Sequence, residues 1–220
     1  MPYVLRPPIR KIGLSFALVV AAFAFSASPA LAASCPAEPS SQIFSIYGDS
    51  DFYSLVPGGD FDYTTPGWTF QRAIAESTDS LKRSAAPHLV SDTNAKSLKI
   101  DRQGYAVSPP LCVSIRHPSF RFFAFKKDGG AGNLNVTLRY RTSGGDVDRD
   151  VPVASLDSES FRSWHLAQSL PLWDALPLGR NEIAQVRLVF QYGFKPNGDP
   201  DPNVKNLWRI DEVYVDPYRR

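Results

Sequence analysis

Cysteine and histidine are scarce in this chain of 220 residues, which has two of the first and three of the second. The histidines, His88, His117 and His165, stand in separate segments, and none lies in a Gly-x-Ser-x-Gly or His-Glu-x-x-His pattern. Two cysteines and scattered histidines do not form the close ligand pairs of a zinc site. The sequence has no recognisable motif for a nucleophile or a catalytic metal, and we predict no catalytic residue.

Long apolar runs are also rare, and the clearest one lies near the start of the chain. Basic residues precede an apolar run over 12–25, and Ala30-Leu31-Ala32 places small residues where a signal peptidase reads. The run is shorter than the roughly 20 residues that span a bilayer. We therefore predict a signal peptide over 1–32 and a secreted protein, free or associated with the cell wall, without a membrane span in the mature chain.

An excess of charge is missing once that segment is removed. The chain has 24 basic and 22 acidic residues, and loss of Arg6, Arg10 and Lys11 with the signal peptide leaves 21 basic residues. A net charge near −1 gives no general attraction to nucleic acid or to an anionic membrane surface. We predict neither as a partner, and we expect a monomer.

Cys35 and Cys112 both follow the predicted signal peptide. An even number of cysteines in an exported chain favours a disulfide, and these two allow a single pairing. A Cys35–Cys112 bond would tie the N-terminal extension, residues 33–54, to a strand-like segment and stabilise the fold by about 3–4 kcal/mol. The alternatives are two buried free thiols and a lipid anchor on Cys35, which follows a partial lipobox.

Prolines and glycines interrupt short runs of alternating apolar residues, which is typical of an all-β domain. Residues 134–141 and 185–192 alternate apolar and polar side chains, whereas 120–125 is apolar on nearly both faces and is expected in the middle of a sheet. Further strands are predicted within 68–84, 147–153 and 208–215. We predict one domain over 55–220, an all-β two-sheet jelly-roll sandwich of about eight to ten strands.

Two motifs near the ends of the mature chain combine glycine, aromatic and acidic residues. Val56-Pro57-Gly58-Gly59-Asp60-Phe61-Asp62 is followed by Gly67-Trp68, and Trp208-Arg209-Ile210-Asp211-Glu212-Val213 lies near the other end. In order and spacing they resemble the opening and closing motifs of galactose-binding-like jelly-roll carbohydrate-binding modules. The resemblance implies that the first and last strands meet. Residues 48–59 and 213–220 also resemble a group of small secreted bacterial proteins whose function is uncharacterised.

The same resemblance implies a metal site, because members of that family often hold a structural calcium ion between these two ends. Asp62 and Asp211 match acidic positions of the family, the first of which is usually Glu. Asp92, with a backbone carbonyl near Lys96, would complete the set, since calcium accepts six to eight oxygens without strict geometry. We predict calcium at Asp62, Asp92 and Asp211. Solvated acids and backbone caps are the alternative.

The resemblance also implies a carbohydrate ligand. Sugars stack on aromatic rings and bond to flanking polar side chains, and the chain supplies seven candidate aromatic residues: Tyr47, Tyr53, Tyr105, Trp164, Trp173, Tyr192 and Phe194. We predict that Trp173 and Tyr192 contact the ligand beside a polar patch of Arg139, Arg141, Arg187 and Gln191 on one sheet face. The alternative is that the rings fill the core and that the arginines form an ordinary solvated face.

The sequence therefore favours a secreted, non-catalytic module that binds cell-wall or extracellular glycan. A structural or protein-interaction domain of the cell envelope is the second hypothesis, with an exposed sheet face as its contact surface. A glycoside hydrolase is the third, because paired carboxylates can perform that chemistry. Asp146, Asp148 and Asp150 alternate along one segment, but a charged edge strand that resists aggregation explains them more simply.

Overall fold

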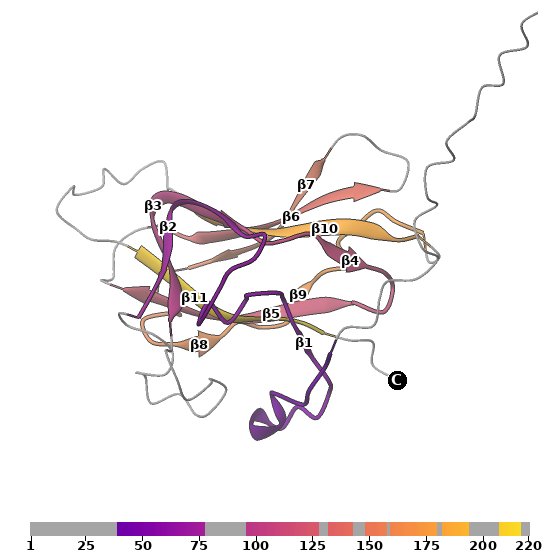
Figure 1. The fold of residues 1–220 in the computed structure, drawn as a ribbon, viewed down its shortest axis with the longest axis horizontal. Coiled ribbons are helices and arrows are strands. Elements are labelled where there is room, and N and C mark those ends of the chain that lie inside the picture. The colour runs from indigo at the N-terminus through magenta and orange to yellow at the C-terminus, as the bar shows by residue number, and fades with distance from the viewer. Residues whose placement is uncertain are drawn as a thin grey trace, which may run out of the picture. The chain divides into compact units, whose positions relative to one another are not determined.

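The computed structural model describes residues 39–77, 96–127, 132–142, 148–157, 159–179, 182–193 and 207–216. Apart from one 3-10 helix, every regular element in these residues is a β-strand (Figure 1). The elements are η1 (Ser45–Tyr47), β1 (Ser54–Leu55), β2 (Thr69–Glu76), β3 (Ser97–Val107), β4 (Leu111–Val113), β5 (Ser119–Lys127), β6 (Leu134–Thr142), β7 (Arg149–Leu156), β8 (His165–Leu166), β9 (Leu170–Pro171), β10 (Ala184–Tyr192) and β11 (Leu207–Val215). In the described part of the chain, no helix is long and apolar enough to cross a bilayer.

The strands form a continuous sheet that is folded into two packed layers (Figure 1). Hydrogen-bonded neighbours follow the order β7-β6-β10-β3-β11-β5-β8, with β2 on β3, β4 on β10, β1 on β11 and β9 on β5. Residues Tyr105–Val107 of β3 pair with β10, whereas Leu98–Asp101 pair with β11. We call β7, β6, β10 and β4 the first sheet and β11, β5, β8, β9 and β1 the second; β2 and β3 belong to both. The predicted all-β, two-sheet jelly-roll sandwich is confirmed.

The β2–β3 hairpin bends where it passes from one sheet into the other. The register between the two strands shifts between Gln71 and Ala73, and Arg72 and Gln103 adopt left-handed backbone conformations with φ of 50° and 60°. Gly104 is required at this corner because a Cβ there would lie 2.5 Å from the Arg72 carbonyl oxygen. Bulges of this kind let strands turn from one sheet into another.

Alternating side chains of the two sheets meet in one hydrophobic core. The residues of β6 and β10 that were predicted to face inward are buried: Leu134, Val136, Leu138, Tyr140, Val186, Leu188, Phe190 and Tyr192. Phe122 of β5 packs edge-on against Phe190, with 5.0 Å between ring centroids, and so connects the two sheets. Because a one-residue slip would turn these side chains to the other face, the alternation fixes the register of both strands.

The two end motifs lie side by side, as predicted. Strand β1 pairs with the last two residues of β11. Beyond it, the Val56 N–H donates to the Val213 carbonyl at 2.9 Å, and the Val213 N–H donates to the Gly59 carbonyl at 3.0 Å. A Cβ on Gly59 would lie 2.9 Å from the Val56 oxygen and 3.1 Å from the Val213 oxygen, so this close approach requires glycine.

Residues 39–53, which we call the strap, cover part of the outer surface of the second sheet. Phe44 and Tyr53 pack against Phe123 of β5 and Tyr214 of β11 in a second hydrophobic cluster. The rings of Phe44 and Tyr53 meet edge-on with centroids 4.6 Å apart. Strand β11 is buried along its whole length. The predicted N-terminal extension is therefore, in its described part, a packed layer of the domain.

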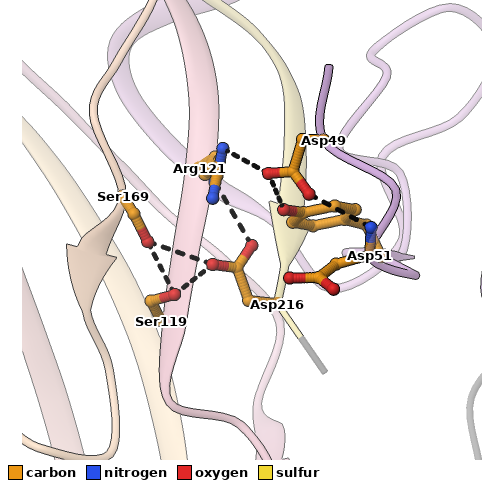
Figure 2. A network of polar contacts seen from close by, with 7 residues as sticks. Asp49, Asp51, Ser119, Arg121, Ser169 and Asp216 are labelled. Atoms are coloured by element: carbon orange, nitrogen blue, oxygen red, sulfur yellow. Dashed lines mark hydrogen bonds and ion pairs between the residues drawn. The ribbon is translucent and has the colours of Figure 1, made fainter. Parts of the chain in front are cut away.

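Polar contacts fasten the strap to the second sheet (Figure 2). Arg121 of β5 lies 3.0 Å from Asp49 Oδ2 of the strap and 3.5 Å from Asp216 Oδ1. The Tyr53 hydroxyl donates to Asp49 Oδ2 at 2.5 Å, and two serine hydroxyls donate to the other oxygen of Asp216. Arg121 Nε and Asp216 Oδ1 attract each other by charge without forming a hydrogen bond. The network as a whole is a structural clasp between the strap, β5 and the end of β11.

Three of the sequence predictions fall outside the described residues. The signal peptide over 1–32, Cys35 and Asp92 all lie in parts of the chain that the structure does not describe. Cys112 lies in β4 and is half-buried, opposite Gln185 of β10. The signal peptide, the Cys35–Cys112 disulfide and the third calcium ligand therefore stay predictions.

Candidate functional site

The outer surface of the first sheet is polar, and the strap lies on the opposite side of the sandwich, beneath the second sheet (Figure 1). Along β6 and β10, polar residues alternate with buried ones, except at Val189, which is buried; the polar residues are half-buried or exposed. The same surface continues over the neighbouring ends of β2 and β3. We call the following residues the polar face: Gln71 of β2, Tyr105 of β3, Arg187 and Gln191 of β10, and Asn135, Arg139 and Arg141 of β6.

One row of the polar face places an aromatic ring among amide side chains. In the strand register, Gln71 lies opposite Tyr105, Tyr105 lies opposite Gln191, and Gln191 lies opposite Asn135. Neighbouring strands are about 4.8 Å apart, and residues paired in this way point to the same side. A half-exposed ring is thus flanked on both sides by groups that donate and accept hydrogen bonds.

A second group on the polar face consists of arginines. Arg139 forms two hydrogen bonds with Asp150 of β7, at 2.8 Å and 2.9 Å. Those hydrogen bonds raise the pKa of Arg139 and lower the pKa of Asp150. Burial partly opposes both shifts. Arg141 lies 3.0 Å from Asp148, and Arg187 donates to the Ser108 carbonyl at 3.2 Å. The acids Asp148 and Asp150 are therefore partners of arginines on this sheet.

The structure brings together four of the six predicted ligand-binding residues. Arg139 lies opposite Arg187, and Arg141 lies opposite Gln185, so both β6 arginines share one face with Arg187 and Gln191. Their contact with a ligand stays a prediction. The shared face itself follows from the alternation of β6 and β10.

The two predicted aromatic residues lie elsewhere. Trp173 exposes 7% and Tyr192 exposes 4% of their surfaces, and both belong to the core. The Lys126 ammonium group donates to the Tyr192 hydroxyl at 2.8 Å and lies 4.2 Å from the centre of its ring. Neither ring offers an open face for stacking. Tyr192 continues the inward alternation of β10. Trp173 fills the core beneath its loop, and tryptophan side chains are often buried in this way.

Sequence reasoning included Tyr105 among the aromatic residues but missed its position, and it missed Gln71 altogether. Both residues lie beside the corner of the β2–β3 hairpin, where the register shift and the left-handed residues break simple alternation. Gly104, directly before Tyr105, was the available signal, because glycine within a strand often marks a bulge. A bulge reverses the inward and outward assignment of the residues that follow it.

The junction of the two end motifs contains buried acids. The register of β11 shifts between Asp211 and Tyr214, and Glu212 has a φ of 52° within this bulge. Asp62 and Asp211 expose 1% and 0% of their surfaces. Asp62 Oδ1 accepts a hydrogen bond from the Lys96 N–H at 2.7 Å, so Lys96, which follows Asp92 in the chain, contacts Asp62.

These acids lie close enough to influence one another. Burial raises the pKa of Asp211 well above its usual value, and the charges of Glu212, Asp62 and Asp60 act in the same direction. Burial also raises the pKa of Glu212 to about 7, against the opposing effect of a hydrogen bond from the Tyr214 hydroxyl. Buried like charges of this kind are stabilised by a proton or by a cation between them.

The predicted calcium site can be tested in part against this geometry. Asp62 and Asp211 are buried at one junction, and no described donor reaches Asp211 Oδ2. Hard oxygen donors of this type suit calcium. Within the described ranges, no group of three or more His, Cys, Asp or Glu side chains is arranged to hold a metal. The donors present fit the ion, but they amount to two side chains rather than a complete set.

No protein-family profile and no curated protein sequence matches the chain. Among solved structures, the xylan-binding domain CBM22-1 of Xyn10C from Paenibacillus barcinonensis is 14% identical over 84% of this chain and 99% of its own, with a TM-score of 0.47. TmCBM61, solved with β-1,4-galactotriose, is 10% identical over 74% of this chain and 97% of its own, with a TM-score of 0.37. The family 11 carbohydrate-binding module of Lic26A-Cel5E from Clostridium thermocellum is 13% identical over 75% and 94%, with a TM-score of 0.39. All three are carbohydrate-binding modules, but a likeness with TM-scores below 0.5 does not decide what this chain binds.

Proposed function

We propose that the protein is a non-catalytic carbohydrate-binding module and that its polar face holds the glycan. The observation that carries this proposal is the row formed by Gln71, Tyr105 and Gln191, in which a half-exposed ring lies between two amides. Pyranose rings present an apolar face to aromatic side chains and hydroxyl groups to amides and guanidinium groups. The polar face supplies both kinds of contact on a rigid sheet.

The contrast with the other aromatic residues supports this choice of site. Trp173 and Tyr192 are enclosed by the core, and Phe44 and Tyr53 are enclosed by the strap and the second sheet. Tyr105 combines a place on a sheet face with polar neighbours at the same level of adjacent strands. Ligand sites on rigid sheets need little ordering when the ligand arrives, which favours binding.

The experiment is affinity electrophoresis and calorimetry of the full chain against a panel of soluble cell-wall polysaccharides. We expect wild-type protein to bind at least one of them and Tyr105→Ala to bind it at least tenfold more weakly, which corresponds to about 1.4 kcal/mol. The matched control is Tyr47→Ala, which removes a tyrosine that is 44% exposed and belongs to the strap. Its affinity should equal that of wild type.

Two outcomes would overturn the proposal. Failure of correctly folded protein to bind any polysaccharide in the panel would favour a structural or protein-interaction domain. Equal loss of binding in Tyr105→Ala and Tyr47→Ala would move the site away from the polar face. Thermal unfolding of each variant establishes that the protein compared is folded.

We also propose that calcium binds at the junction of the chain ends, with carboxylate oxygens from Asp62 and Asp211. The ion would neutralise acids whose mutual repulsion and burial are unfavourable. Asp92 remains the proposed third side chain, because Lys96, four residues further along the chain, donates its N–H to Asp62. The role of the ion would be structural, since this junction holds the first strand against the last.

The proposed place of action is outside the cell. This part of the proposal is supported by the basic, apolar and small-residue order of residues 1–32, which is that of a signal peptide. Cell-wall and extracellular glycans are the carbohydrates that a secreted module meets.

A further inference from the structure

The charges on the polar face do not balance. It contains three arginines, and the two acids that face them are both engaged: Asp150 with Arg139 and Asp148 with Arg141. Within the described parts of the chain, no ion pair joins Arg187 to a carboxylate. Its one contact there is the hydrogen bond to the Ser108 carbonyl.

In the strand register, Arg187 of β10 lies directly opposite Arg139 of β6, so two positive charges face each other. Like charges at directly opposed positions destabilise a sheet. Asp150 binds Arg139 from β7, the strand on the far side of β6, and therefore does not lie between the two guanidinium groups. An anion placed over the β6–β10 pair would relieve the repulsion.

The remaining hydrogen-bonding capacity of Arg187 indicates what kind of anion fits. A guanidinium group has five N–H donors in a planar fork that matches the two oxygens of a carboxylate, and the Ser108 carbonyl accepts from Nη1. Arg139 and Asp150 already form this two-bond arrangement on the same sheet. Arg187 is half-buried, so a bond to a charged ligand group would be only partly screened by solvent.

The aromatic row and the arginines lie on the same side of the same two strands, because the pair Gln191–Asn135 is four residues along β10 and β6 from the pair Arg187–Arg139. We propose that the glycan bound by the polar face is acidic and that the carboxylate of a uronic acid residue binds Arg187. This inference rests on the proposed carbohydrate-binding function and names its ligand class. Arg187 is then the residue that separates acidic from neutral polysaccharides.

The test compares polymers that differ only in their carboxylates. Polygalacturonate, alginate and glucuronoxylan are each presented beside a carboxyl-reduced form of the same polymer, and affinity is measured by calorimetry at low and at moderate salt. We expect at least tenfold tighter binding of one acidic polymer than of its reduced form. We also expect this preference to shrink as salt is added, because the contact is charged.

Three variants identify the contact. Arg187→Gln should lower affinity for the acidic polymer about tenfold and leave affinity for the reduced polymer unchanged. Arg187→Lys, which keeps the charge but loses the fork, should fall between Arg187→Gln and wild type. The matched control Arg116→Gln removes an exposed arginine from the turn between β4 and β5 and should bind as wild type does.

Failure of the inference and failure of the proposed function give different results. Equal affinity for every acidic polymer and its reduced form, with both lost in Tyr105→Ala, would overturn the acidic ligand and keep the carbohydrate-binding module. Arg187-dependent binding of dextran sulfate without binding of any uronate polymer would also overturn the uronate assignment. Absence of binding to all polymers would overturn both.

Discussion

The two outer faces of this sandwich differ in whether another part of the chain covers them. On the outer face of the second sheet, the strap covers the apolar side chains Phe123 and Tyr214, and the Arg121 clasp holds it there. The face of the first sheet keeps its polar residues half-buried or exposed, with arginines and amides around Tyr105. The same architecture therefore closes one side and leaves the other side available to a ligand.

The difference is set by which side chains alternate outward. Strands β5 and β11 turn Phe123 and Tyr214 to their outer side, and such rings need a cover. Strands β6 and β10 turn arginine, asparagine and glutamine outward, and these groups are stable in water. Variants of the covered face should therefore change stability, whereas variants of the polar face should change binding.

The largest effect is expected from Phe44→Ala. Phe44 is fully buried at the centre of the strap cluster, and removing a buried phenylalanine costs about 3–5 kcal/mol of unfolding free energy. Urea unfolding followed by tryptophan fluorescence measures this. Tyr47→Ala, on an exposed part of the strap, should cost about 1 kcal/mol or less. Similar losses in the two variants would show that the strap does not pack as described.

The next effect is expected from Arg121→Ala. The Arg121 side chain is 14% exposed and neutralises Asp49 and Asp216. Removing it should cost about 2–3 kcal/mol, somewhat less than the loss of one partner from a fully buried pair. Arg141→Ala is the control on the polar face, where the side chain is 50% exposed and the expected cost is about 1 kcal/mol or less. Equal losses of unfolding free energy in Arg121→Ala and Arg141→Ala would show that the two faces do not differ in how strongly their ion pairs stabilise the fold.

A smaller effect is expected from calcium at the junction of the chain ends. If the ion binds there, it should stabilise the wild-type protein by about 1.4 kcal/mol when its concentration is ten times the dissociation constant. Asp211→Asn should lose this gain, yet in EDTA it should be at least as stable as wild type, because it removes a buried charge beside Glu212 and Asp62.

Thermal unfolding with calcium and with EDTA measures both halves of that prediction. Asp174→Asn, which changes an exposed acid in the loop after β9, is the control and should respond to calcium as wild type does. If calcium at concentrations up to millimolar leaves the melting temperature of wild type unchanged, the proposed calcium site is wrong.

The smallest effect is expected at the Arg139–Asp150 pair on the polar face. The hydrogen bonds from Arg139 lower the pKa of Asp150 in the folded state. The resulting stabilisation is complete above the unfolded pKa and is lost as the pH falls through the lower folded value. Since the two side chains are 38% and 48% exposed, we expect at most about 0.5 kcal/mol.

That contribution is measured as the difference in unfolding free energy between wild type and Asp150→Asn at pH 7 and at pH 2.5. The difference should be small at pH 7 and should vanish at pH 2.5. A difference above about 2 kcal/mol at pH 7 is typical of a desolvated pair and would contradict an open polar face.

The sequence was sufficient to predict the fold class and most long strands, because strict alternation in β6 and β10 reports one buried and one exposed face. The meeting of the chain ends was also predicted, through the resemblance of the two end motifs to the opening and closing motifs of jelly-roll modules, and the structure confirms it. The strap was not predicted. The strap packs on the sheet because Phe44 and Tyr53 contact residues far away in the sequence, and no local sequence pattern predicts such a contact.

The candidate site was predictable in its polar part only. Arg139, Arg187 and Gln191 follow from alternation, and the structure places them on one face. Tyr105 was assigned no position because its orientation depends on a bulge, and bulges shift inward and outward residues by one. Trp173 was predicted to contact the ligand but is buried in the core, because a tryptophan in a loop can point toward solvent or into the core.

The central place of β11 has a consequence for how the protein is made. The last strand of the described chain lies between β3 and β5 and also supplies the partner of β1. A nascent polypeptide that has not yet extended past Leu207 has neither the middle of its second sheet nor a partner for its first strand. The second sheet therefore cannot be completed until the residues of β11 have been synthesised.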